Sequence, residues 1–331
     1  SNAGRMVALM GDAELDEGNI YECLIEAAKH DIRNCWWIVD YNRQSLDATT
    51  AERMFRRFDE IFASCGWRVA TLKYGKALEA AFGEPGGEAL KAWLEAVGNA
   101  DYAALTYLGG GAWRERLLTD APETRPLLDG RDDEALAALM TNLAGHDMES
   151  LVEAFDAARD DVPTLFIAYT IKGFGLPFAG HKDNHAGLMN PGQIAALRSA
   201  MGIAEGEEWE PWAGLGGNSA EAAKALVEDS RIARAKRDRP WNQVEIPSVP
   251  APAGEEQSTQ AAFGRILLDL SRAGGPLADR VVTTSPDVTV STNLGAWVNQ
   301  RGLFRRQELA DVFAAAKIPS AQKWGATRAG Q

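Results

Sequence analysis

Two apolar runs separated by an amphipathic stretch open the chain, and this alternation is the strongest constraint on its fold. Met6–Met10 predicts one strand and Cys35–Val39 predicts another. The second run is continuously apolar, as in strands that are buried on both faces. Between them, apolar residues recur with helical spacing from about Asn19. Strands that alternate with helices form βαβ units, so the sequence predicts an α/β fold with a parallel sheet flanked by helices.

The same alternation continues along the chain and then stops. Residues 173–190 hold four glycines and two histidines and predict a long loop, which in a compact domain is commonly functional. The proline-rich stretch 241–257 predicts a linker. Further helices are expected at 54–65, 86–98, 136–143, 147–158 and from Ser258 or Thr259 through Leu270, and further strands at 67–72, at 164–171 and from Val281–Val282.

Composition and charge exclude several classes of protein. The net charge of -13 argues against a nucleic-acid binder, which needs Lys and Arg against phosphates. A mild basic cluster at Arg231–Arg239 is interpreted as a solvated helix face rather than a binding patch. No apolar run approaches the roughly 20 residues that cross a bilayer. Three cysteines, at positions 23, 35 and 65, lack metal-like spacing, so we expect a reducing, cytoplasmic compartment.

Polar residues follow the first two predicted strands where each strand ends. Asp12 comes after the first strand and Asn42 after the second. Carboxyl ends of parallel strands share one edge of the sheet, where ligands bind. Two oxygen ligands there suit Mg²⁺, which often borrows phosphate oxygens. Acidic side chains within 14–17 would repel a metal-free phosphate, and segment 11–16 lacks the dinucleotide glycine fingerprint. Spacing alone is equally compatible with Asp12 capping a helix and Asn42 lying in a turn.

Several motifs in order resemble one enzyme family. Gly11-Asp12-Ala13-Glu14, followed by Asn42, resembles the thiamine-diphosphate motif of transketolase and pyruvate dehydrogenase type enzymes, written Gly-Asp-Gly, a spacer, then Asn-Asn. The runs Asp40–Asp47, Ala144–Asp147 and Tyr169–Gly175 resemble the homodimeric decarboxylating first component of pyruvate dehydrogenase. The resemblance continues more weakly past the linker and covers nearly the whole chain.

The resemblance implies a site for thiamine diphosphate and Mg²⁺. In that family pattern the metal is held by the side chains of Asp12 and Asn42 and by the backbone carbonyl of Gln44. The residues implied to line the diphosphate are Gly11, Ala13 and Glu14. Two departures, Ala13 in place of glycine and Tyr41 in place of asparagine, remove no metal ligand.

The predicted loop carries the implied catalytic residues. Lys172 is implied to lie near the cofactor and substrate anions, and His185 to contact the bound intermediate. His181 is a second candidate for the same role. His146 and His30 are interpreted as structural. Outside the loop, Asp287 is matched, in poorly aligned surroundings, to an acid of the family's pyrimidine-binding domain.

The resemblance also implies a domain organisation. Residues 1–3 look like a remnant of tag removal. Residues 4–240 are expected to form the diphosphate-binding, transketolase-like domain without its N-terminal part, and residues 258–331 to begin a second α/β domain, the pyrimidine-binding domain, in truncated form. Because no segment matches the family's pyrimidine-contacting Glu, we expect a fragment that is itself inactive.

The implied function is thiamine-diphosphate- and Mg²⁺-dependent oxidative decarboxylation of a 2-oxo acid such as pyruvate. The acyl group would pass to a lipoyl-bearing acyltransferase component, and the intact protein is expected to be a homodimer without a nucleic-acid or membrane partner. One alternative is transketolase-type ketol transfer between sugar phosphates, which needs cations around the site. A second is a non-catalytic scaffold with the same fold. A nicotinamide-dependent oxidoreductase is disfavoured by the missing fingerprint.

Overall fold

The computed structural model describes residues 4–45, 48–158, 160–230, 243–249, 251–252, 256–285, 288–306, 310–319 and 323–331. The chain divides by its internal contacts into two units, residues 1–230 and 231–331. Each unit is described by itself. The α/β class predicted from the sequence is confirmed, because the first unit contains a four-stranded parallel sheet flanked by helices.

The sheet of the first unit has the strand order β1-β2-β6-β5, and all three pairings are parallel. In its register, Gly11 lies opposite Asp40, and Tyr41 lies opposite Tyr169. The carboxyl ends of β1, β2 and β6 are therefore level with one another. Every residue of β6 is buried, as expected for a central strand. The strands are β1 (Met6–Gly11), β2 (Cys35–Tyr41), β6 (Thr164–Tyr169) and β5 (Arg68–Leu72).

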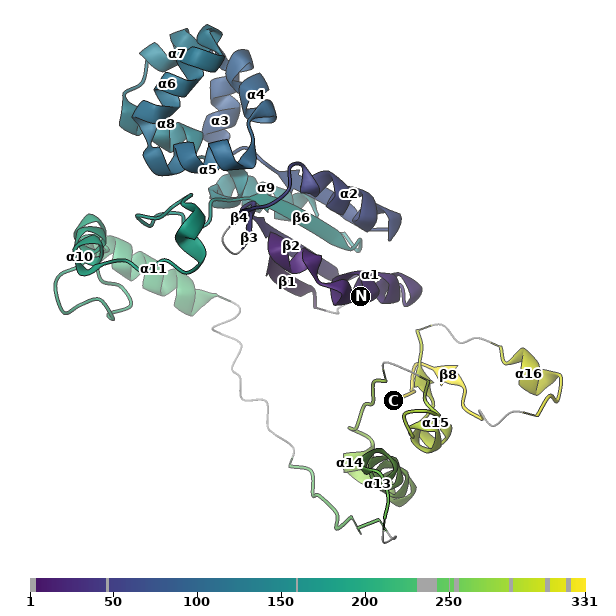
Figure 1. Ribbon diagram of the computed structural model, residues 1–331. Coiled ribbons are helices and arrows are strands. Elements are labelled where there is room, and N and C mark those ends of the chain that lie inside the picture. The colour runs from purple at the N-terminus through teal and green to yellow at the C-terminus, as the bar shows by residue number, and fades with distance from the viewer. Residues whose placement is uncertain are drawn as a thin grey trace. The chain divides into compact units, whose positions relative to one another are not determined.

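Helices fill most of the remaining first unit. Figure 1 shows α3 to α8 gathered in a cluster of their own beside the sheet. The α-helices are α1 (Gly18–Lys29), α2 (Met54–Ser64), α3 (Lys76–Phe82), α4 (Gly87–Ala96), α5 (Asn99–Leu108), α6 (Gly110–Asp120), α7 (Arg125–Asp129), α8 (Asp133–Met140), α9 (Met148–Ala157), α10 (Pro191–Ala200) and α11 (Gly217–Asp229). Smaller elements are η1 (Asp12–Asp16), the hairpin β3 (Gln44–Ser45) and β4 (Ala48–Thr49), η2 (Pro122–Thr124), η3 (Ala144–His146) and η4 (Lys182–His185).

One apolar core joins the sheet to the helical cluster. Trp37 and Val39 of β2, Phe62 of α2 and Trp113 of α6 all belong to it, and the last two are fully buried. Phe62 and Trp37 meet edge to face with ring centroids 5.5 Å apart. Such contacts add to the free energy gained from apolar burial. The cluster of α3 to α8 is thus part of the same packed body as the sheet.

The second unit is small and largely helical. Its elements are α13 (Thr259–Ala273), α14 (Gly275–Ala278), α15 (Gly295–Arg301), β7 (Leu303–Phe304), α16 (Val312–Ala315) and β8 (Ala326–Thr327). The predicted cap is confirmed, since Ser258 accepts a hydrogen bond from the Ala261 amide. The strand predicted at Val281–Val282 is wrong. Val282 is 72% exposed, and among the described residues neither valine pairs with a strand.

The end of β6 differs from its prediction, and several predicted regions lie partly or wholly outside the described residues. β6 ends at Tyr169, before the predicted end at Ile171, because the Ile171 amide donates to His146 Nε2 and leaves the ladder. Asp287 and Arg231–Arg239 lie outside the described residues, and the linker 241–257 is described only in part. The identities given to the two domains stay predictions.

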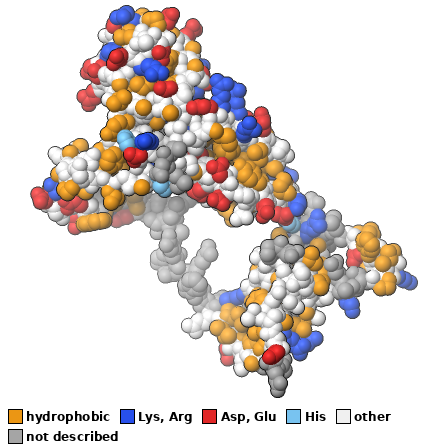
Figure 2. Space-filling model, viewed as in Figure 1, with side chains coloured by type: hydrophobic (Ala, Val, Ile, Leu, Met, Phe, Trp, Pro, Cys, Tyr) orange, Lys and Arg blue, Asp and Glu red, His pale blue; other side chains and the backbone are white. Residues whose placement is uncertain are grey.

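No described helix is long and apolar enough to cross a membrane. Figure 2 shows acidic and basic side chains interspersed over the visible face.

Candidate functional site

Asp12 lies in the interior at the carboxyl edge of the sheet. It follows β1 directly, and its side chain is buried, with 4% of the residue exposed. Its Oδ2 accepts a hydrogen bond of 2.8 Å from the Arg43 amide, which follows β2, and its Oδ1 accepts one of 3.0 Å from the Ala13 amide. The two strand ends are therefore brought together as the βαβ argument predicts.

Asn42 and Gln44 come directly after the carboxyl end of β2. Asn42 Oδ1 accepts a hydrogen bond of 2.9 Å from the Gln44 amide, so the asparagine oxygen is held in a fixed turn. The Gln44 side chain is buried and donates to the Gly180 carbonyl at 3.0 Å. Its Oε1 is buried without a hydrogen-bond partner among the described residues. The segment that follows β2 therefore offers an oriented asparagine oxygen and an unpaired glutamine oxygen, and its Arg43 amide contacts the Asp12 carboxylate.

The pKa of Asp12 is raised to about 6, mainly by burial and also by the charge of Asp40, while the Arg43 and Ala13 amides and the Arg43 charge oppose the shift. These opposing groups offset only part of the desolvation, so the carboxylate would be stabilised by further positive charge. A divalent cation would supply that charge. The donor set therefore fits Mg²⁺, which takes a carboxylate and a few further oxygens and completes its octahedron with water or phosphate.

The set contains only one ionisable ligand. Among the described residues, no three His, Cys, Asp or Glu side chains are arranged to hold a metal ion. A site made of Asp12, Asn42 and the Gln44 carbonyl would therefore depend on oxygens from a bound diphosphate.

The predicted diphosphate segment is a short 3₁₀ turn that starts directly after β1. Glu14 Oε1 accepts a hydrogen bond of 2.9 Å from the Gly11 amide, so this side chain braces the turn. Ala13 replaces the motif's glycine, but it is not among the non-glycine residues with positive φ. Its backbone conformation is therefore one that any residue adopts, and the methyl group imposes no backbone strain.

The loop after β6 brings two of its three candidate residues together. Lys172 Nζ lies 3.2 Å from His185 Nδ1. His181 has another position: its Nδ1 accepts from the Asp183 amide at 3.1 Å, and its ring meets Tyr107 edge to face with centroids 4.7 Å apart. The structure thus pairs Lys172 with His185 and uses one nitrogen of His181 to cap η4.

Hydrogen bonds tie this loop to the carboxyl edge of the sheet. Gln44 bonds the Gly180 carbonyl, and the Asn184 side chain donates to the carbonyls of Lys172 and Phe178 at 2.6 and 2.9 Å. The strand-end residues and the Lys172–His185 pair therefore belong to one locally connected region.

His146 and Arg43 also shape the region. His146 accepts from the Ile171 amide at 2.9 Å and stacks on Phe174 with centroids 3.9 Å apart, so its predicted structural role agrees with its contacts. Sequence reasoning missed Arg43. It is buried with φ of 64°, and its Nη2 donates to the Thr170 carbonyl at 2.8 Å. The only sign of Arg43 in the sequence is its position directly after Asn42.

Comparison with known proteins gives a consistent result. The chain is 26% identical over 313 residues to the pyruvate dehydrogenase E1 component of Corynebacterium glutamicum, which covers 88% of this chain and 34% of that protein. It is similar to pyruvate dehydrogenase E1 components. The Escherichia coli K12 protein is 28% identical over 184 residues, 54% of this chain and 20% of its own length, and the Cupriavidus necator protein is 26% identical over 196 residues. No family model matches.

These matches are partial in length. The chain spans about a third or less of the curated relatives it matches. What the similarity supports directly is a relationship to part of the pyruvate dehydrogenase E1 components.

Proposed function

We propose that this chain is part of a thiamine-diphosphate- and Mg²⁺-dependent enzyme that decarboxylates a 2-oxo acid, with pyruvate the favoured substrate. The buried Asp12 carboxylate beside Asn42 and Gln44 carries the proposal. The acyl group would pass to a lipoyl group on a partner protein. We further propose a homodimeric, cytoplasmic intact protein, as the family resemblance implies. The domains proposed within this chain are a diphosphate-binding domain at 4–240, a linker at 241–257 and part of a pyrimidine-binding domain at 258–331.

The residues at the strand ends would hold the metal and the diphosphate. Asp12 would give a carboxylate oxygen, Asn42 its amide oxygen and Gln44 its backbone carbonyl. Gly11, Ala13 and Glu14 would line the diphosphate. When bound there, thiamine diphosphate would supply the carbanion chemistry that decarboxylation of a 2-oxo acid needs.

Lys172 and His185 would act on the substrate side. Where Lys172 Nζ is the donor in its 3.2 Å contact with His185 Nδ1, the ring proton of His185 lies on Nε2. That Nε2–H can donate to a carbonyl or carboxylate oxygen, and Lys172 adds a positive charge near it. His181 keeps Nε2 for a similar contact, because its Nδ1 caps η4. The loop would limit water access when substrate is bound.

Calorimetry tests the proposal on the full-length protein. Thiamine diphosphate should bind with Mg²⁺, bind far more weakly with chelator, and lose its metal-dependent affinity in Asp12→Ala. Asp16→Ala is the matched control, because Asp16 lies on the same 3₁₀ turn and belongs to neither the proposed metal ligands nor the diphosphate lining. Absence of binding under every condition would reject the enzyme proposal and leave the scaffold alternative.

One observation favours the transketolase alternative. Arg53, Arg56 and Lys73 line a cavity at the carboxyl end of the sheet, and sugar phosphates require such cations. Product formation from pyruvate and from xylulose phosphate distinguishes the two, because turnover of the sugar alone would assign ketol transfer.

A further inference from the structure

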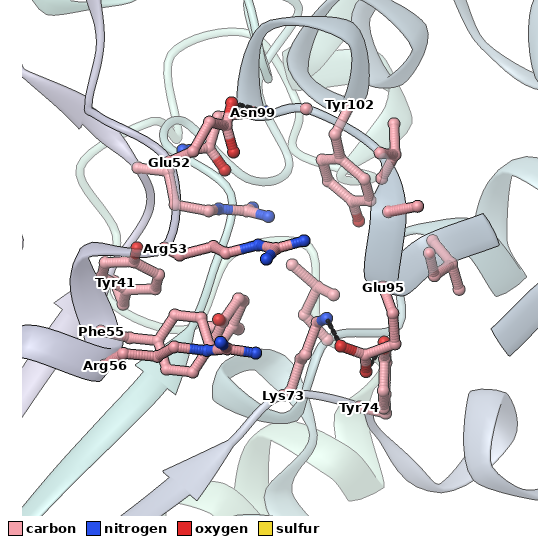
Figure 3. A pocket seen from close by; sticks show the side chains of 17 residues that line it. Tyr41, Glu52, Arg53, Phe55, Arg56, Lys73, Tyr74, Glu95, Asn99 and Tyr102 are labelled. Carbon is pink, nitrogen blue, oxygen red and sulfur yellow. Dashed lines mark hydrogen bonds and ion pairs between the residues drawn. The ribbon is translucent and has the colours of Figure 1, made fainter. Parts of the chain in front are cut away.

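A cavity of about 350 Å³ lies between the carboxyl ends of the sheet and the helical cluster. The sheet contributes Tyr41 and Tyr169 from the ends of β2 and β6, and the helical side contributes Glu95, Asn99 and Tyr102. Figure 3 shows Tyr41, Glu95, Asn99 and Tyr102 around an open space. The volume falls at the small end of the range for small-molecule sites.

Positive side chains dominate the cavity. Figure 3 shows Arg53 and Arg56, from the start of α2, and Lys73, which follows β5, pointing toward the same space, and buried Arg43 also lines it. In Figure 2 basic side chains gather between the helical cluster and α2. The cavity is lined by four cations and by two acids, Glu52 and Glu95.

Both acids are already engaged. Glu95 lies 3.0 Å from Lys73 Nζ and accepts from the Tyr74 hydroxyl at 2.6 Å. Glu52 Oε1 accepts from the Asn99 amide at 2.8 Å. Within the described part of the chain, the guanidinium groups of Arg53 and Arg56 have no ion pair. These two arginines therefore form no direct ion pair, and the four cations of the lining outnumber its two acids.

Arg43 has an unused donor at the base of the cavity. It is nine-tenths buried, and its Nε has no hydrogen-bond partner among the described residues. Its guanidinium carbon lies 4.7 Å from the centre of the Tyr102 ring, which holds the group in place. A buried guanidinium donor without an acceptor carries a desolvation cost that a bound anion would offset.

The backbone and the rings fix the remaining cations. Arg53 is the N-cap of α2 with φ of 60° and ψ of 28°, so the positive end of the helix dipole adds to its charge. Lys73 Nζ lies 4.9 Å from the centre of the Tyr74 ring. Burial lowers the pKa of Lys73, and the charges of Arg43 and Arg53 lower it further, against the opposing effect of Glu95. Crowded like charges of this kind favour an anion between them.

We propose that this cavity binds the phosphate group of a small organic molecule. Guanidinium forks match phosphate oxygens in bidentate geometry, and three arginines line this one cavity. The aromatic walls leave room for a compact organic body beside the phosphate. The proposal does not depend on cofactor binding at Asp12.

Titration calorimetry with inorganic phosphate, in chelator to prevent metal-dependent binding, tests the site on the full-length protein. The variant combines Arg53→Asn, which tolerates the left-handed backbone, with Arg56→Gln. Arg57→Gln is the matched control, since Arg57 lies on the same helix but does not line the cavity. Phosphate affinity should fall at least about tenfold in the double variant, because two charged donors are lost, and stay unchanged in the control.

Either of two results would overturn the proposal: no phosphate binding to the parent protein, or equal weakening in Arg57→Gln. A phosphorylated ketose separates the possible sources of the phosphate. Turnover of the ketose that is lost in the double variant would assign the phosphate to a substrate. Cavity-dependent binding of the ketose without turnover would assign it to a separate ligand. Failure of thiamine diphosphate binding would leave the phosphate result intact.

Discussion

The buried surroundings of Asp12 disfavour the ionised form of its carboxyl group. Burial raises its pKa to about 6 from 3.8. The folded state therefore holds the proton more tightly than the unfolded state, and stability falls as pH rises between these two values. The shift of about two units corresponds to roughly 3 kcal/mol of destabilisation above pH 6. A cation bound at Asp12, as proposed, would offset this cost.

Asp12→Asn removes the charge and keeps the side chain's shape. In chelator, the parent should lose stability between pH 4 and pH 7.5 because only the parent acquires the buried charge. The difference in free energy of unfolding between variant and parent should therefore shift in the variant's favour by up to about 3 kcal/mol over this range. Loss of one of the two accepted backbone hydrogen bonds lowers the variant's stability equally at both pH values. Urea unfolding at both pH values measures the difference. A difference that stays constant with pH would contradict the raised pKa.

At the scale of elements, one side chain joins two helix starts. Asp147 Oδ1 accepts from the Ser150 amide at 2.9 Å and caps α9, while Oδ2 accepts from the Lys76 amide at 3.0 Å at the start of α3. These backbone hydrogen bonds, that of Ser150 first, lower the pKa of Asp147. The stabilisation is thus present above the unfolded pKa and is lost as pH falls through the lowered folded value.

Asp147→Ala should lower the free energy of unfolding by about 2 kcal/mol, because two amides lose their acceptor. Asp132→Ala is the matched control. Asp132 caps α8 through a single accepted bond, from the Ala135 amide at 2.8 Å, so about 1 kcal/mol is expected. Chemical denaturation of both variants at pH 7 measures the two values. Equal losses would show that the bonds to Oδ2, from the Lys76 amide and from the Asn142 side chain at 3.3 Å, contribute nothing.

Elements that the sequence predicted well share a local signal. β2 and β6 are continuous apolar runs, and α2 and α9 have clear periodicity. The stretch from α5 to α7 was not predicted, because Gly109–Gly111 interrupts the pattern. In the structure Gly109 has φ of 87° between α5 and α6, and a Cβ on Gly110 would lie 1.7 Å from the Asp133 carbonyl oxygen. The glycines permit close helix packing, which only the tertiary structure reveals.

The candidate site, like the fold, could be predicted from the sequence only in part. Parallel pairing alone indicated that the ends of β1 and β2 meet, and Asp12 does contact the backbone that follows Asn42. The metal and cofactor roles of these residues stay predictions. The position of Arg43 depends on Tyr102, Tyr169 and Thr170, which are distant in sequence. Convergence of that kind has no local signature, so the cationic cavity was not foreseen.

At the scale of the whole molecule, the two units have separate cores. The core of the first unit contains Trp113, and the core of the second contains Trp297. Both indoles are fully buried. Because a buried side chain stabilises only the core that it packs into, the two units should respond independently to loss of these residues.

Trp297→Ala should lower the stability of the second unit by roughly 3–5 kcal/mol, the usual cost of removing a buried tryptophan. Hydrogen exchange followed by mass spectrometry would then show faster exchange in α13 and α15 and unchanged exchange in β2 and β6. Trp113→Ala is the reciprocal control, and it should accelerate exchange in α5 and α6 but not in α13. If either substitution accelerated exchange in both units, the cores would be energetically coupled. Unfolding of one unit would then also destabilise the other, so the stability of the proposed metal site would depend on residues beyond 230.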